Sequence, residues 1–217
     1  ARRCNARKVE GRAFAFTGGL RFMRTRLHEA RDDFEKALAI HRETKDRPFE
    51  SVALGDLATV LRSLGEKKEA VAHYQEAIAI ADSIGDRRNV GLHRGNVAGL
   101  LHAEGRLDEA RTHYDEAIAI LREVGSFRVL GAIIANSATL LQEQRDFKGA
   151  RERLEDALKL FEQIGERPLA AEHRGHLGRI AHEQGRLDEA RAFYEAAIAG
   201  LDEAHDESYA ALFRGAL

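Results

Sequence analysis

The chain has 217 residues, of which 44% are hydrophobic and 32% charged, a composition typical of a soluble protein with an apolar core. Its 34 Lys and Arg residues against 36 Asp and Glu residues give a net charge of -2, which argues against a nucleic-acid partner, because such a partner favours a basic face. No apolar run is long enough for a membrane span, and the single Cys4 excludes an internal disulfide and favours a reducing compartment, predicted to be the cytoplasm.

A 40-residue period runs through the chain. The segment GRLDEAR occurs at 105–111 and again at 185–191, two periods later. Within each period a small, a large and a second small side chain follow one another at helical spacing, which predicts one buried helix face. The three series are Ala30, Ala70, Ala110, Ala150 and Ala190; Phe34, Tyr74, Tyr114, Leu154 and Tyr194; and Ala37, Ala77, Ala117, Ala157 and Ala197.

Each period is predicted to contain two helices, called A and B in chain order. The A helices are expected to end at Gly65, Gly105 and Gly185, because glycine readily adopts the left-handed conformation that closes a helix; Thr25 and Arg145 are the exceptions at this position. The predicted repeats are 7–46, 47–86, 87–126, 127–166 and 167–206, and 207–217 would begin a sixth.

The predicted N-caps of the later A helices follow the same period. They are Asp46, Asp86, Ser126 and Asp206, with Glu166 as a poorer cap, and the only two prolines, Pro48 and Pro168, fall in the first helical turn. In the first repeat, Thr17 and Arg21 occupy expected core positions, so we expect its A helix to be displaced or frayed.

The period and the small, large, small signature resemble the tetratricopeptide repeat, a helix-turn-helix unit. The 40-residue form, with IGDRR at 84–88 and IGER at 164–167, is similar to Pins/LGN adaptors and to repeat arms of large bacterial signalling proteins. The resemblance implies an all-α, right-handed α-solenoid of antiparallel helix pairs, with about five repeats and a partial sixth helix. Arg94 and Arg174 depart from the family, which usually has a bulky apolar residue there, as do Ser137 for a core leucine and Arg145 for the turn glycine.

In this family the A helices line the concave face, so the resemblance places partner-binding residues on them. The predicted groove residues are Asp56, Thr59, Leu92, Asn96, Ala132, Asn136, Thr139, Glu172, His176 and Arg179. An Asn amide suits pairing with a peptide backbone, although hydrogen bonding within the repeat explains it equally well. Glycine recurs at Gly55, Gly95 and Gly175 although it weakens a helix, which indicates close packing, by a neighbouring helix rather than a ligand.

Other candidate sites have a simpler explanation. HRG at 93–95 and 173–175 fits duplication of a two-repeat unit; alternatively Arg94 and Arg174 make charge contacts with acidic groups of a partner. His173, His176 and Glu172 could supply metal ligands from one helix, but histidines recur at repeat-related positions, so we predict no metal and no cofactor. Because there is no glycine-rich phosphate loop and no fixed base near Cys4, we expect no enzyme.

We therefore expect a protein-interaction scaffold that binds a peptide or partner domain in the concave groove, as a regulatory arm of a larger signalling protein. A small-molecule sensor arm of a bacterial regulator and a structural self-assembly module stay open. The 27 Arg against 7 Lys fit a GC-rich bacterial genome, and the lack of an initiator Met indicates an excerpt of a longer protein. Because 207–217 is apolar and short, we expect Tyr194 and Ile198 to be incompletely covered, and copies to associate end to end.

Overall fold

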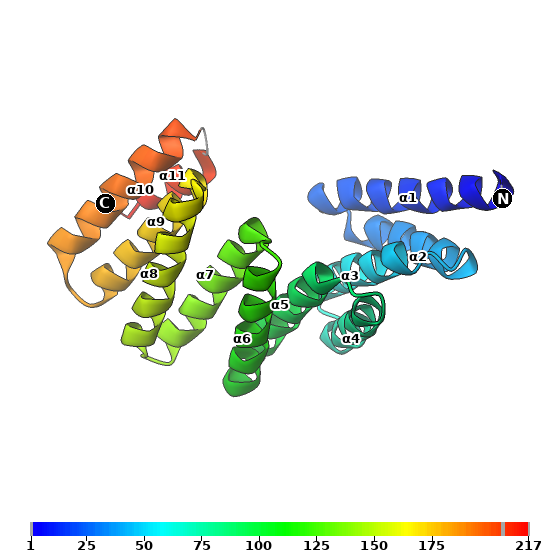
Figure 1. Ribbon diagram of the computed structural model, residues 1–217, viewed down its shortest axis with the longest axis horizontal. Coiled ribbons are helices and arrows are strands. Elements are labelled where there is room, and N and C mark those ends of the chain that lie inside the picture. Colours follow the sequence, from blue (N-terminus) through cyan, green and yellow to red (C-terminus); the bar gives the residue numbers. More distant parts are fainter. Residues whose placement is uncertain (1, 205–206, 217) are drawn as a thin grey trace. The chain divides into compact units, whose positions relative to one another are not determined.

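The computed structural model describes residues 2–204 and 207–216, and the described part of the chain contains α-helices and no strand (Figure 1). The helices are α1 (Arg2–Met23), α2 (Leu27–Glu43), α3 (Arg47–Leu64), α4 (Lys67–Ser83), α5 (Arg87–Ala103), α6 (Leu107–Glu123), α7 (Phe127–Glu143), α8 (Phe147–Ile164), α9 (Arg167–Glu183), α10 (Leu187–Glu203) and α11 (Glu207–Arg214). The all-α fold of paired helices is confirmed. None of the described helices has the length and apolarity that a membrane crossing requires.

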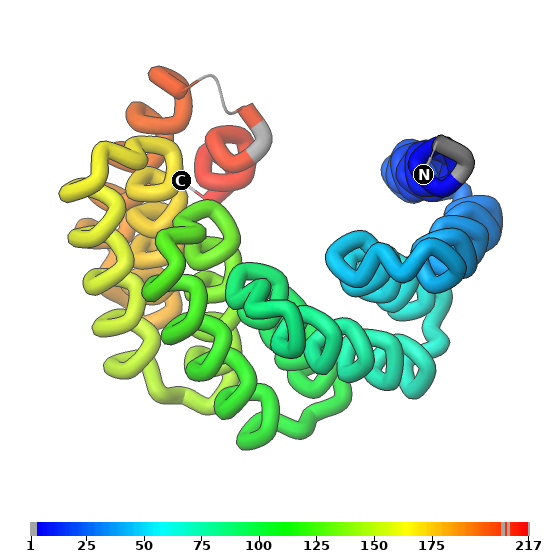
Figure 2. The backbone as a smooth tube through the Cα atoms, turned by 45° about the vertical axis from the view of Figure 1, so that its right-hand side comes forward, coloured from blue at the N-terminus to red at the C-terminus, as the bar shows by residue number. Residues whose placement is uncertain are grey.

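The chain divides into two compact units, Ala1–Val124 with α1 to α6 and Gly125–Leu217 with α7 to α11. Figure 2 follows the chain through the successive helix pairs of each unit. In the first unit each helix packs against the next, and the A helices α1, α3 and α5 also contact their nearest A neighbours. In the second unit α7 and α9 make the same contact between A helices. A row of A helices thus forms one layer of each unit; that 7–206 is a single array stays a prediction.

The turns between helices recur in one conformation. Gly65, Gly105 and Gly185 have φ values of 85°, 75° and 72°, which confirms the predicted left-handed ends of the A helices. The two exceptions in the sequence, Thr25 and Arg145, adopt the same conformation with φ values of 57° and 63°. The turn is therefore retained where glycine is absent, at the cost of placing a Cβ in a region that L residues disfavour.

The predicted N-caps are only partly correct. Asp86 accepts a hydrogen bond from the backbone N–H three residues later at 3.1 Å, as a cap does. Asp46 and Ser126 hold the N-cap positions of α3 and α7, but their side chains make no capping hydrogen bond, so their predicted role is wrong. The Asp46 carboxylate instead faces α1, 3.5 Å from Lys8 Nζ and 3.7 Å from Arg12 Nη2, because the neighbouring helix offers a cation.

Two further predictions concern the first helical turns. Pro48 and Pro168 lie in the first turns of α3 and α9, as predicted, where the missing N–H has no intrahelical acceptor to lose. The Glu166 side chain makes no capping hydrogen bond, which agrees with its prediction as a poorer N-cap. Asp206, the last predicted N-cap, lies outside the described residues.

The core follows the periodic series. All five first alanines are buried, from Ala30 at 0% to Ala190 at 3% exposure, and the large side chains between the two alanine series are buried with them. Because an alanine on one helix lets the neighbouring helix approach closely, each large side chain packs in the space between adjacent helices. The predicted buried face of the B helices is confirmed.

The first A helix is continuous, so the predicted fraying is wrong. Arg21, at an expected core position, reaches α2 and forms an ion pair with the buried Asp33 at 2.7 Å. Thr17 is exposed, and its hydroxyl donates to the Phe14 carbonyl at 3.0 Å. Polar residues at core positions are thus tolerated in α1, because one finds a charged partner and the other turns to its own backbone.

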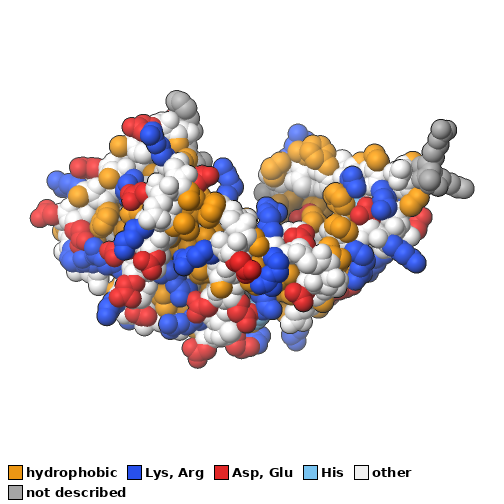
Figure 3. Space-filling view, viewed as in Figure 1, with side chains coloured by type: hydrophobic (Ala, Val, Ile, Leu, Met, Phe, Trp, Pro, Cys, Tyr) orange, Lys and Arg blue, Asp and Glu red, His pale blue; other side chains and the backbone are white. Residues whose placement is uncertain are grey.

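Apolar side chains are exposed on α1. Val9, Phe16 and Met23 are 63%, 68% and 73% exposed, and their seven-residue spacing places them on one helix face. Figure 3 shows hydrophobic side chains over this helix. The first unit therefore has an apolar outer stripe at its first helix.

The last helix pair is covered, which corrects the expected exposure of Tyr194. Phe213 of α11 stacks on Tyr194 with ring centroids 5.9 Å apart, and the two rings are only 4% and 3% exposed. Ala210 joins the same buried cluster, and the half-buried Ile198 packs against it. The Phe213 ring of α11 therefore covers Tyr194 of α10.

Candidate binding site on the A helices

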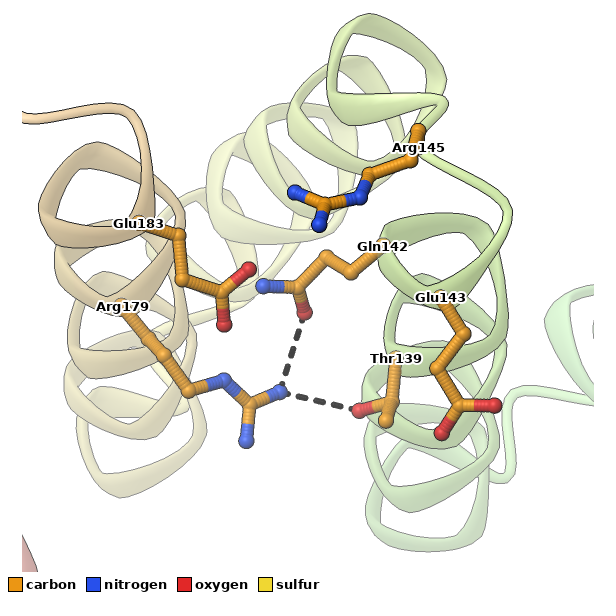
Figure 4. Close-up of a pocket in the computed structure, with 6 residues that line it drawn as sticks. All are labelled: Thr139, Gln142, Glu143, Arg145, Arg179 and Glu183. Carbon is orange, nitrogen blue, oxygen red and sulfur yellow. Dashed lines mark hydrogen bonds between the residues drawn. The ribbon is translucent and has the colours of Figure 1, made fainter.

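A pocket of about 560 Å³ lies between the neighbouring A helices α7 and α9 of the second unit. Figure 4 shows the six side chains that line it. They are Thr139, Gln142 and Glu143 of α7, Arg145 of the following turn, and Arg179 and Glu183 of α9. Two of them, Thr139 and Arg179, are among the groove residues predicted from the sequence.

Arg179 crosses the pocket from α9 to α7. Its Nη2 donates to Thr139 Oγ1 at 2.9 Å and to Gln142 Oε1 at 3.1 Å. The Thr139 hydroxyl in turn donates to the Ala135 carbonyl at 3.1 Å, one helical turn earlier. These bonds hold both the guanidinium and the Gln142 amide in fixed orientations, because each has a directional partner.

Two buried donors at this pocket have no partner among the described residues. Gln142 is only 6% exposed, and its Nε2 makes no hydrogen bond. The Nε of Arg179 is buried and also unpaired. Since buried N–H groups are nearly always paired, each of these two donors is able to take an acceptor from water or from a ligand.

Charged side chains of both signs line the pocket. Arg145 and Arg179 contribute two cations, and Glu143 and Glu183 contribute two anions. In Figure 4 the Arg145 guanidinium extends toward Gln142, and the Glu183 carboxylate faces the amide nitrogen of Gln142. Arg145 also lies 5.8 Å from the centre of the Phe147 ring. The pocket is therefore strongly polar and close to neutral in net charge.

The other predicted groove residues of the second unit lie on the same two A helices. Ala132 and Asn136 are exposed on α7, whereas Glu172 and His176 are partly buried on α9. Burial lowers the pKa of His176 to about 3, with a smaller contribution from the Arg179 charge, so this ring is neutral near pH 7. Its ring meets Phe213 edge-on at 6.2 Å.

The His173 and His176 pair shows no metal-site geometry. The Nδ1 of His173 lies 2.8 Å from the Leu169 carbonyl, so this nitrogen is used inside the helix. The two imidazole rings are edge-on at 6.1 Å. Within the described part of the chain, no group of three or more His, Cys, Asp or Glu side chains is placed to hold a metal ion.

In the first unit the predicted residues Asp56 and Thr59 lie on α3, and Leu92 and Asn96 lie on α5, all partly buried. The Thr59 hydroxyl lies 2.9 Å from the carbonyl four residues earlier and 2.8 Å from the Tyr74 hydroxyl, which joins the A helix to its B helix. Burial raises the pKa of Asp56 to about 6. This carboxyl group is therefore poorly solvated on the A-helix layer.

Arg94 and Arg174 already have partners within the chain. Arg94 pairs with Glu116 of α6, and Arg174 pairs with Glu162 of α8. The partners lie on B helices in both cases, although one follows its arginine in sequence and the other precedes it. Each guanidinium therefore has an intramolecular counter-ion, which favours a structural role for both.

Two of the three recurring glycines, Gly55 and Gly175, are explained by packing, as predicted. A Cβ at Gly55 would lie 2.2 Å from His93 Cε1 of α5, and one at Gly175 would lie 2.0 Å from Phe213 Cζ of α11. Both distances are far too short for a real Cβ. Each glycine is thus required by a ring on the helix that packs against it, rather than by a ligand.

Four lining residues escaped the sequence analysis as site residues: Gln142, Glu143, Arg145 and Glu183. One of them carried a signal. Arg145 replaces a glycine at a left-handed turn, and non-glycine residues in that region are often kept for function. The polar residues at 142, 143 and 183 carried no such signal, because polar side chains near helix ends are ordinary surface residues.

The fold is shared with solved repeat structures. A kinesin light chain with nearly identical TPR-like repeats from Podosopora anserina is 19% identical, with a TM-score of 0.71 over 89% of this chain and 95% of that one. Aspartyl phosphate phosphatase F from Bacillus subtilis is 16% identical, with a TM-score of 0.84 over 96% of this chain and 55% of that one. The Rap conjugation gene regulator of plasmid pLS20, in complex with its Phr peptide, is 19% identical, with a TM-score of 0.69 over 93% of this chain and 56% of that one.

This chain therefore spans little more than half of the two bacterial regulators, and identities this low show the fold alone. No sequence among the curated proteins matches. Family models described as tetratricopeptide repeat match residues 18–83, 92–124 and 130–203, which is well over half of the chain. The helix pairs, the left-handed turns and the buried alanine series agree with these matches. The chain belongs to the tetratricopeptide repeat family.

Proposed function

We propose that this chain is a protein-interaction module whose A helices bind a peptide or an extended segment of a partner protein. The observation that carries the proposal is the pocket between α7 and α9, where Gln142 and Arg179 present buried donors with no partner among the described residues. Peptides carry regularly spaced acceptors, and a layer of parallel A helices offers several contact points along one segment.

The openness of the pocket favours a peptide over an enclosed metabolite. Three of its lining residues, Glu143, Arg145 and Glu183, are exposed, so the site is a depression that a longer ligand can cross. The plasmid regulator of similar fold contains a Phr peptide in its solved structure, which supports the same class of ligand here. We place the module, as a regulatory arm, in a larger bacterial signalling protein of the cytoplasm.

A small-molecule sensor is the second candidate. The pocket volume of about 560 Å³ lies within the range of small-ligand sites, and its polar groups converge from two helices. A sensor would bind a free metabolite at this pocket without contacts along the other A helices. The two candidates therefore differ in how many A helices contribute to affinity.

The test begins with peptides selected for binding from a displayed random library. Calorimetry then measures their affinity for the unaltered chain, for the pocket variant Arg179→Ala, and for Asn136→Ala, an exposed position of α7 outside the pocket lining. We expect each variant to weaken binding at least tenfold, about 1.4 kcal/mol, with unchanged helix content by circular dichroism. Glu195→Ala, on the exposed surface of α10, is the matched control and should bind normally.

Two results would overturn the proposal. If the selected peptides bind all variants equally, the A helices are not the binding surface. If Arg179→Ala alone reduces affinity while Asn136→Ala binds as well as the unaltered chain, binding is confined to the pocket, as a sensor requires.

A further inference from the structure

The chemistry of the α7–α9 pocket indicates the kind of group that it accepts, and this inference rests on the proposed function. Because Arg179 Nη2 donates to Gln142 Oε1, the acceptor end of the Gln142 amide is already used. Its Nε2 is the end of the amide that has no hydrogen bond: this nitrogen is buried and has no acceptor among the described residues. The hydrogen bond thus determines which end of the amide is presented: the pocket offers a donor here.

A second donor accompanies it. The Nε of Arg179 is also buried and unpaired, although the other end of the guanidinium is bound to Thr139 and Gln142. Both orphan donors belong to side chains that line the same pocket. A ligand oxygen with two lone pairs could accept from both, so the first requirement on the ligand is a carbonyl-type oxygen.

The charges of the pocket argue against an ion as the best ligand. A carboxylate would meet the Arg145 and Arg179 cations but also the Glu183 anion, and an ammonium group would be attracted by Glu183 but repelled by both arginines. Like charges brought together in a partly buried site oppose binding. A neutral group avoids this repulsion while it keeps its hydrogen bonds.

The Glu183 carboxylate supplies the complementary acceptor. It points toward the amide nitrogen of Gln142 in Figure 4, and no hydrogen bond joins the two groups. A ligand that binds to both groups would have to accept from Gln142 and donate to Glu183. An amide does both, because its carbonyl oxygen accepts and its N–H donates.

We propose that the pocket between α7 and α9 binds a neutral amide group of the partner, with its carbonyl oxygen on Gln142 Nε2 and Arg179 Nε and its N–H on the Glu183 carboxylate. The amide could be the side-chain carboxamide of an Asn or Gln, or a backbone peptide group. Both sources offer a carbonyl oxygen and at least one N–H, and the experiment distinguishes them.

The test uses the full chain labelled with ¹⁵N and three probes of similar size: propionamide, propionate and propylammonium. Side-chain resonances of Gln142 and Arg179 report binding, and Gln142→Met identifies the Gln142 signals by their loss. We expect propionamide to shift both side chains saturably and to bind at least fivefold more tightly than either ion. Tighter binding of propionate or propylammonium, or the absence of any shift with propionamide, would overturn the proposal.

Two variants test the assignment of roles. Gln142→Met removes the donor at similar size and should abolish the propionamide response of Arg179, while Gln163→Met, an exposed site on α8, should leave it intact. Glu183→Gln removes an anion and should change the preference toward propionate by at least fivefold. This second variant lies at an exposed position, so it remains informative if Gln142→Met fails to fold. An unchanged preference in Glu183→Gln would refute the charge argument.

The source of the amide is decided with two blocked tripeptides, acetyl-Ala-Gln-Ala and acetyl-Ala-Ala-Ala, each as the N-methylamide. Tighter binding of the Gln peptide assigns the pocket to a side-chain carboxamide, and equal binding assigns it to the backbone; either result supports an amide site. If selected peptides still bind the A helices but propionamide does not bind the pocket, this inference fails while the proposed function stands.

Discussion

Phe213 of α11 occupies the space that a side chain at Gly175 of α9 would need, since a Cβ there would lie 2.0 Å from the Phe213 Cζ atom. The relation repeats one found in the first unit, where His93 packs over Gly55. The three aromatic rings occupy equivalent positions of the 40-residue period: His173 lies two periods after His93, and Phe213 lies one period after His173. The short helix α11 thus places one ring where a following A helix would place its own.

Removal of that ring should expose the end of the second unit. We expect Phe213→Ala to destabilise the protein by about 3 kcal/mol, because it deletes a buried aromatic side chain that covers Tyr194. It should also increase self-association, which sedimentation over a hundredfold concentration range would detect. Leu212→Ala, at a neighbouring position that is 60% exposed, is the control and should change neither property.

The arginines of the two HRG segments should prove structural. Because Arg94 and Arg174 pair with Glu116 and Glu162 at positions that are partly open to solvent, we expect Arg94→Leu and Arg174→Leu each to lower stability by at most about 1 kcal/mol. The salt dependence of partner affinity should be unchanged. In a double-mutant cycle, Glu116→Gln should cause little further loss of stability when Arg94→Leu is already present. A flatter salt dependence in either arginine variant would instead assign it to the partner interface.

Asp56 should destabilise the folded chain at neutral pH. Burial raises its pKa to about 6, so the unfolded chain loses this proton at lower pH than the folded chain does. Stability therefore falls as pH rises from about 4 to 6, and the cost is complete above that range. We expect Asp56→Asn to raise unfolding free energy by about 1–3 kcal/mol at pH 8 and to have little effect at pH 4. The exposed Asp32→Asn should show no such difference between the two pH values.

His93 should give the opposite pH dependence. Burial lowers its pKa to about 4, partly opposed by the Asp86 charge, so the unfolded chain binds this proton first as pH falls. The stability that is present above about pH 6.5 is therefore lost progressively toward pH 4. Isoleucine stands one period after His93, at Ile133, so we choose His93→Ile as the variant. It should reduce the loss of unfolding free energy between pH 7 and pH 5 by about 1–2 kcal/mol. Denaturant titrations at both pH values measure the unfolding free energy. The control His28→Ile, at an exposed position, should lose as much stability between the two pH values as the unaltered chain does.

The left-handed turn at Lys45 offers a stabilising substitution. Lys45 has a φ of 52°, whereas glycine holds the equivalent position after α4, α6 and α8, at Gly85, Gly125 and Gly165. We expect Lys45→Gly to stabilise the first unit by about 0.5–1 kcal/mol, since relief of the strained backbone exceeds the added flexibility of the unfolded chain. The reciprocal change Gly85→Ala should destabilise it by a similar amount. If Lys45→Gly lowers the melting temperature, the lysine side chain makes a contact that outweighs the strain.

The amino-acid sequence by itself determined the helix pairs, the left-handed turns and the buried alanine series. These features depend on local backbone preferences and on spacing along one helix, which a 40-residue period repeats until it is unmistakable. The same reasoning failed where a side chain had a choice of partners. Asp46 was predicted to cap its own helix, but it faces Lys8 and Arg12 because α1 lies next to it.

Only the tertiary structure decided what covers Tyr194 and what the pocket between α7 and α9 offers. That Phe213 covers Tyr194, and that Gln142 presents its amide nitrogen because Arg179 holds its oxygen, both depend on distances between side chains from different helices. The 40-residue period marks which positions meet, since His93 over Gly55 repeats as Phe213 over Gly175, but it does not mark which side-chain atoms pair there. Hydrogen bonding is directional and burial depends on neighbours in space, and neither can be read from spacing along a single helix.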